Sequence, residues 1–145
     1  MKQKQYLWKV LRNMCFTASF VPDYYTYEKL CKDSIKLAGG KVLKGEEYFD
    51  PNTISLKQVN RICTEALSPI LQKRPRYHSS CQNLSRSHSS FVGLYVFEGL
   101  SQGHGEFIKM GRTCNLDARL KTYRRNGESI QNLTLYEVIS SARWL

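Results

Sequence analysis

The chain has 145 residues, enough for one ordinary domain or for a small domain with an appendage. Hydrophobic residues make up 41% of it, and its net charge of +10 indicates a polyanionic partner without saying which. The five cysteines are odd in number and form no CxxC pair, which favours a reducing intracellular compartment over a disulfide scaffold. No apolar run approaches the ~18–20 residues that a membrane helix needs, so we expect a soluble protein with no membrane partner.

The N-terminal part of the chain, residues 1–78, is predicted to be mainly helical. Apolar residues repeat at helical spacing over Tyr6–Cys15 and again over Tyr27–Ile35, after which Gly39-Gly40 is a stop signal. Ser55 and Gln58 have the spacing of a capping box ahead of a third helical run, which Pro69 ends or kinks. Mixed charges and a long connection disfavour a helix-turn-helix, so we expect an accessory bundle or extension. A role in partner contact stays open.

Residues 79–90 are half serine and are predicted to be a linker. His78, Cys81 and His88 lie in or beside this segment, but their spacing matches no common structural zinc site and no second ligand pair follows. The sequence therefore predicts no metal site here.

Residues 91–125 place two strand-like runs, a glycine-rich loop and an arginine-bearing helix in one compact order. Phe91–Phe97 alternates with the period of a strand, three glycines break the chain, and Phe107–Met110 is the returning strand. Thr113 or Asn115 can then cap a helix that ends near Arg125. Six basic residues and one acid lie between positions 109 and 125. Such a run is in itself typical of a solvated helix face.

This order resembles the GIY-YIG nuclease superfamily, and most closely the branch named after a phage T5 open reading frame. In that branch the second signature commonly reads KIG and is followed by Arg-Thr. Gly93-Leu94-Tyr95 lies where the family has GIY, and Lys109-Met110-Gly111 where it has YIG or KIG. Arg112-Thr113 and Asn115 follow, and Arg119, eight residues past Gly111, lies where the family places its catalytic arginine. Tyr123 lies where some members have His or Tyr.

The resemblance implies an α+β fold for residues 91–145, a small three-stranded antiparallel sheet with flanking helices whose third strand is Leu133–Ile139. It also implies hydrolysis of DNA phosphodiester bonds. Tyr95 would accept the proton of a water molecule, Lys109 would favour the phenolate, and Arg119 would hold a phosphate oxygen. Mg²⁺ would be the cofactor of an active enzyme. The basic residues that we expect to contact DNA are Arg112, Lys121, Arg124 and Arg125.

One departure from the family concerns the metal. The metal-binding glutamate of the family lies on a helix after the third strand, whereas here the chain stops at Leu145, so we expect a truncated domain without that metal site. The remaining acids near the motif lie in strands or loops: Glu98, Glu106, Glu128 and Glu137. Two hypotheses stay open, a GIY-YIG-type endonuclease and a non-catalytic nucleic-acid-binding module. A degenerate, inactive truncation is a third. A nuclease needs a carboxylate near Tyr95 and Arg119, whereas a binding module does not.

Overall fold

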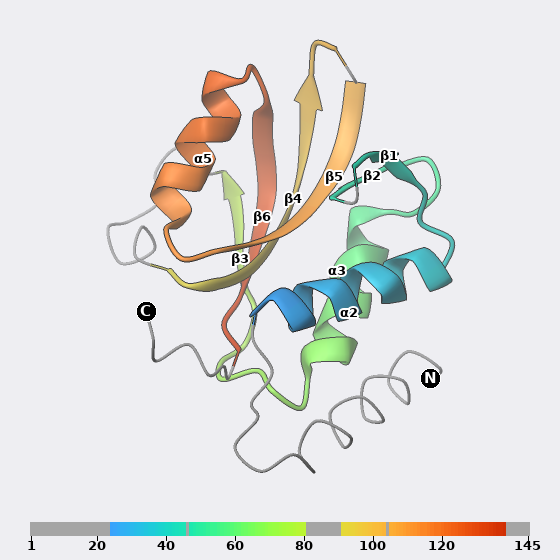
Figure 1. The fold of residues 1–145 in the computed structure, drawn as a ribbon, viewed down its shortest axis with the longest axis vertical. Coiled ribbons are helices and arrows are strands. Elements are labelled where there is room, and N and C mark those ends of the chain that lie inside the picture. The colour runs from blue at the N-terminus through green and yellow to red at the C-terminus, as the bar shows by residue number, and fades with distance from the viewer. Residues whose placement is uncertain (1–23, 46, 81–90, 104, 139–145) are drawn as a thin grey trace.

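The computed structural model describes residues 24–45, 47–80, 91–103 and 105–138. These form three helices and a six-stranded antiparallel sheet with the order β1-β2-β5-β4-β6-β3. Helices α2 and α3 cover one face of the sheet and α5 covers the other (Figure 1). The helices are α2 (Tyr24–Leu37), α3 (Leu56–Leu67) and α5 (Leu116–Arg125), and the strands are β1 (Val42–Lys44), β2 (Tyr48–Phe49), β3 (Arg76–Ser80), β4 (Gly93–Ser101), β5 (Gly105–Thr113) and β6 (Ser129–Tyr136).

The prediction of a three-stranded sheet preceded by a mainly helical region is wrong. Strands β5, β4 and β6 are antiparallel neighbours as expected, but β2 and β1 extend the sheet beyond β5, and β3 extends it beyond β6. Strands β1 and β2 have only three and two residues, too few for a period-two pattern, and the sequence of β3 is RYHSS, without apolar alternation. Strands β2 and β3 form through pairing with the distant strands β5 and β6, and β1 joins the sheet through its neighbour β2. Strands from both sides of the predicted linker thus join one sheet.

Several local signals are confirmed. In α3 the Gln58 amide donates to the Ser55 hydroxyl at 3.1 Å and the Gln58 side chain accepts from the Ser55 amide, which completes the capping box. Helix α2 ends before Gly39, whose φ of 101° suits glycine, and the Gly40 amide donates to the Ile35 carbonyl at 3.0 Å. The expected helix over 6–15 and most of the serine-rich linker lie outside the described residues.

Two apolar clusters lie on opposite faces of the sheet. Towards α2 and α3, β4 and β5 present residues such as Leu94, Val96 and Ile108. Towards α5 they present mainly aromatic side chains, among them Tyr95 and Phe97. Because both faces are covered, the middle of β4 is apolar at every position from 94 to 97, as expected of a central strand. None of the helices that the structure describes is long and apolar enough to cross a membrane.

Candidate functional site

A pocket of about 410 Å³ lies where the start of α2, the end of β5 and α5 meet, within the size range of ligand sites. It contains two of the three predicted catalytic residues, Tyr95 and Arg119, together with two carboxylates, Glu28 and Glu47. The remaining described lining residues come from α2, β5, α5 and the turn between β5 and α5: Tyr24, Tyr25, Gly111, Arg112, Thr113, Cys114 and Tyr123.

Tyr95 is fixed in this pocket by its neighbours on all sides. It lies opposite Gly111 in the β4–β5 register, and a Cβ atom on Gly111 would come within 2.6 Å of the Tyr95 hydroxyl. The hydroxyl lies 2.5 Å from that of Tyr123, and the ring stacks on Phe97 at 6.0 Å between centroids. The glycine of the KMG signature is therefore needed because the tyrosine ring packs directly on it.

Burial sets the protonation of Tyr95. Removal from water raises the pKa of the phenol, while its hydrogen bond with Tyr123 and the charge of Arg119 partly oppose that shift. The raised pKa leaves the hydroxyl protonated at neutral pH. Arg119 is an exposed residue of α5, so its guanidinium combines influence on the phenol with access to a ligand in the pocket.

Lys109 lies on the same sheet face as Tyr95, two positions before Gly111, and is 2% exposed. Its ammonium forms an ion pair with Glu47 and lies 4.4 Å from the ring centroid of Tyr48 and 5.6 Å from that of Tyr123. Burial lowers the pKa of Lys109, and Glu47 opposes this shift. The predicted helper of the tyrosine is thus directed to a carboxylate and to the aromatic rings around it.

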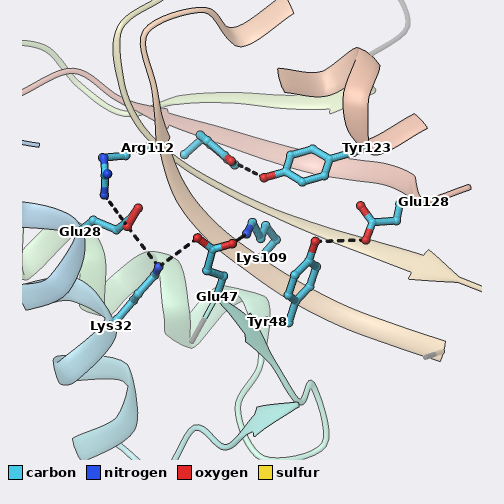
Figure 2. Close-up of polar contacts among 9 residues, drawn as sticks. Glu28, Lys32, Glu47, Tyr48, Lys109, Arg112, Tyr123 and Glu128 are labelled. Atoms are coloured by element: carbon cyan, nitrogen blue, oxygen red, sulfur yellow. Dashed lines mark hydrogen bonds and ion pairs between the residues drawn. The ribbon is translucent and has the colours of Figure 1, made fainter. Parts of the chain in front are cut away.

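Two carboxylates that sequence reasoning missed complete the site. Glu28 on α2 accepts from Arg112 at 3.1 Å and lies 3.2 Å from the ammonium of Lys32. The same ammonium lies 3.9 Å from Glu47. Five charges therefore alternate in sign across the site: Arg112, Glu28, Lys32, Glu47 and Lys109. Figure 2 shows Lys32 between the two carboxylates and Lys109 reaching Glu47 from β5.

The ionisation of Glu47 follows from this network. Its burial alone would favour the neutral acid, but the hydrogen bond and charge of Lys109, with further help from Lys32 and Arg119, hold the pKa of the carboxyl below its usual value. Glu47 is therefore anionic at neutral pH, and the pocket contains a charged oxygen donor beside the tyrosine.

One local signal could have identified Glu28. It occupies the apolar stripe of α2, four residues after Tyr24 and three before Cys31, where a charged side chain is buried on the core side of the helix. Such a buried acid needs a partner, which α2 supplies through Lys32 and β5 through Arg112. Glu47 gives no comparable signal because it lies in the short turn before β2.

The other predicted residues occupy three kinds of position. Thr113 and Asn115 shape the turn from β5 into α5: the Thr113 hydroxyl accepts from the Asn115 amide at 2.9 Å, and the Asn115 side chain accepts from the Ala118 amide at 3.1 Å. A Cβ atom on Gly93 would lie 2.4 Å from the Tyr136 carbonyl, so β4 and β6 approach closely there. Three basic residues are exposed on α5 and do not line the pocket: Lys121, Arg124 and Arg125. Of these, Lys121 forms an ion pair with Asp117.

The acids near the motif lie elsewhere. Glu98 accepts from Asn132, Glu128 accepts from the Tyr48 hydroxyl at 3.1 Å, and Glu137 pairs with Lys73 and Arg76. Neither they nor Glu106 contribute to the pocket lining. The carboxylates of the site come instead from the chain before β4.

The donor set fits Mg²⁺ only in company with other ligands. The described residues contain no group of three or more His, Cys, Asp and Glu side chains that could hold a metal ion. Glu28 and Glu47 lie 3.2 and 3.9 Å from the Lys32 ammonium, which is farther than the ~2.1 Å of a carboxylate–Mg²⁺ bond. Mg²⁺ commonly takes one or two protein carboxylates and completes its shell with water and substrate phosphates. The pair would meet that minimum only with Lys32 displaced and the two carboxylates drawn together.

Comparison with known proteins found no matching family model, curated protein or solved structure. The likeness to GIY-YIG nucleases therefore rests on the motif residues alone.

Proposed function

We propose that the chain is a DNA-binding domain of GIY-YIG type that hydrolyses phosphodiester bonds in the pocket of Tyr95 and Arg119. The observation that carries the proposal is the meeting of these two residues with Glu28 and Glu47 in one pocket, because a nuclease needs a carboxylate there and a binding module does not. The net charge of +10 and the basic face of α5 suit a polyanionic partner. The cysteine pattern favours work inside the cell.

The roles of the residues follow from their positions. Arg119, exposed at the pocket wall, would hold a non-bridging phosphate oxygen with its planar guanidinium. Tyr95, oriented by Gly111 and by its hydrogen bond to Tyr123, would accept the proton of the attacking water once its own proton has left. Because burial raises the pKa of Tyr95, the rate should increase as the pH rises above neutrality. Lys109 would act indirectly, by holding Glu47 as an anion in the site.

Glu28 and Glu47 would hold the Mg²⁺ ion of this chemistry. When bound, the ion supplies positive charge to the phosphate and to the leaving oxygen.

One observation favours binding without cleavage as a second candidate. Both carboxylates are already paired with cations of the chain: Glu28 with Lys32 and Arg112, and Glu47 with Lys109. A module that only binds nucleic acid could keep this network intact and use Arg119 and the basic residues of α5 to bind phosphates.

The test compares nicking of supercoiled plasmid in MgCl₂ by the parent chain, Tyr95→Phe and Arg119→Ala. We expect each substitution to slow nicking by about 100-fold or more, the scale of a lost acid–base or phosphate-binding group. Tyr77→Phe, which alters an exposed tyrosine of β3 on the far edge of the sheet, is the matched control and should cut like the parent. A parent that binds DNA at low salt without cutting it supports the second candidate. A parent that neither binds nor cuts contradicts both.

A further inference from the structure

We propose that a groove along α2 binds the base of an unpaired nucleotide, with Tyr25 as its stacking platform. The inference rests on the proposed function, since the phosphate of the same strand would lie at Arg119. The groove has a volume of about 470 Å³. One face of α2 lines it, together with Arg112 of β5, Tyr48 of β2 and, from the segment before β2, Gly45 and Glu47. It shares four residues with the Tyr95 pocket: Tyr25, Glu28, Glu47 and Arg112. A strand bound at one can therefore continue into the other.

Tyr25 has no role in the core that would explain it. The first turn of α2 contains three tyrosines, of which Tyr27 is fully buried and Tyr24 packs against the core, whereas Tyr25 is 58% exposed. Its ring carries the guanidinium of Arg112 at 5.0 Å from the centroid. That guanidinium is held in turn by the buried Glu28 at 3.1 Å. The aromatic ring and its cation thus form a surface that is already positioned for stacking.

The charges of the groove favour a base over a track for the phosphate backbone. Four cationic side chains (Lys29, Lys32, Lys36 and Arg112) and three anionic ones (Glu28, Asp33 and Glu47) line it. So nearly balanced a lining attracts a polyanion only weakly. A nucleobase, in contrast, gains from an aromatic face whatever the net charge, and every base has such a face.

The geometry also selects the state of the nucleic acid. A base inside a duplex already stacks on its neighbours, so it can reach Tyr25 only if it is unpaired or turned out of the helix. We therefore expect the chain to prefer single-stranded or locally opened DNA near the bond that it cuts.

The experiment measures binding of a fluorescent oligothymidylate by anisotropy in EDTA, which separates binding from cleavage. Tyr25→Ala should bind it about fivefold more weakly than the parent, or worse, as expected for loss of one base–aromatic stack. Tyr25→Phe keeps the ring and should stay within about twofold of the parent. The matched control is Tyr77→Ala, because Tyr77 is 60% exposed on the opposite edge strand and should not matter. Circular dichroism checks that the variants are folded.

A second ligand tests the base itself. On an oligomer of abasic nucleotides of the same length, Tyr25→Ala and the parent should bind alike, because the phosphates remain and the bases are gone. Equal loss on both oligomers, or no loss on oligothymidylate, would overturn the inference. If the parent still cuts DNA in that case, the proposed function stands and only the base site fails. If the parent binds neither oligomer and cuts no DNA, both fail.

Discussion

Replacement of Gly111 by alanine tests the packing on which the site depends. Gly111 pairs with Tyr95 across the β4–β5 ladder, and the added methyl would lie 2.6 Å from the Tyr95 hydroxyl oxygen and 2.8 Å from its Cζ atom. The tyrosine has little room to move, since it is 1% exposed and its ring lies against Phe97 and Tyr123. The strand or the ring must shift.

Two effects of opposite sign determine the magnitude. Overpacking of a filled core typically costs about 1–3 kcal/mol, whereas glycine in a strand is itself less favourable than alanine by roughly 0.5–1 kcal/mol. The steric effect is the larger, so we expect Gly111→Ala to lower the free energy of unfolding by about 1–2 kcal/mol. For a chain of 145 residues, that corresponds to a fall in Tm of roughly 3–7 °C.

The assay is thermal unfolding followed by circular dichroism, with Gly103→Ala as the control. Among the described residues, none places an atom within 4 Å of a Cβ built on Gly103, so that variant should stay within about 0.5 kcal/mol of the parent. In a Tyr95→Phe background the closest atom is gone, and Gly111→Ala should cost less than it does alone. A Gly111→Ala protein that melts at or above the Tm of Gly103→Ala would refute the close packing of the tyrosine on the signature glycine.

Three further predictions concern charge. Lys32→Met removes the ammonium between the two carboxylates, so Mn²⁺ binding measured by calorimetry should tighten about tenfold or more. Lys29→Met, an exposed control on the same helix, should leave the affinity unchanged, and equal Mn²⁺ affinities of Lys32→Met and the parent would contradict the shared site. Because burial raises the pKa of Tyr95, the folded chain keeps a proton that the unfolded chain loses near pH ~10, so the free energy of unfolding in urea should fall as the pH rises above that value. The fall should be less steep in Tyr95→Phe, and the same pH dependence in both proteins would argue against a raised pKa of Tyr95. Joint replacement of Arg124 and Arg125 by Ala should flatten the log–log salt dependence of DNA binding by about 0.9 for each phosphate that the variant no longer neutralises, and an unaltered slope would place DNA elsewhere.

The elements that could be predicted are those that carry their own signal. Strand β4 contains a continuous run of aliphatic and aromatic residues, α5 has its cap in Asn115, and α3 has both halves of a capping box, so each was recognisable from neighbouring residues. Strands β1, β2 and β3 could not be predicted in the same way. Each is short. Strands β2 and β3 depend on partners far along the chain, as in the pairing of Tyr48 with Lys109, and β1, in the part of the chain that the structure describes, pairs only with β2.

The same distinction applies to the site. Tyr95, Lys109 and Arg119 lie within 25 residues in one supersecondary unit, and their order alone indicated a common surface. The carboxylates are 84 residues from Arg112 in the case of Glu28 and 62 residues from Lys109 in the case of Glu47. No spacing rule connects residues so far apart. They meet because α2 packs on the sheet and β2 pairs with β5, which is a property of the tertiary fold.

Whether the chain cuts DNA or only binds it depends on which carboxylate a substrate can free from its present partners. Glu47 is tied to Lys109, whose ammonium is enclosed by the sheet and the rings of Tyr48 and Tyr123 and cannot leave without stranding a buried charge. Glu28 is different, because one of the two cations that it binds is Arg112, whose side chain is 44% exposed and lines both the Tyr95 pocket and the groove along α2. A phosphate that enters the pocket competes for that guanidinium, and each hydrogen bond that it accepts from Arg112 weakens the hold on Glu28. Under the proposed function, the arrival of the substrate would itself make Glu28 available to a cation, so an ion-paired resting site is compatible with catalysis.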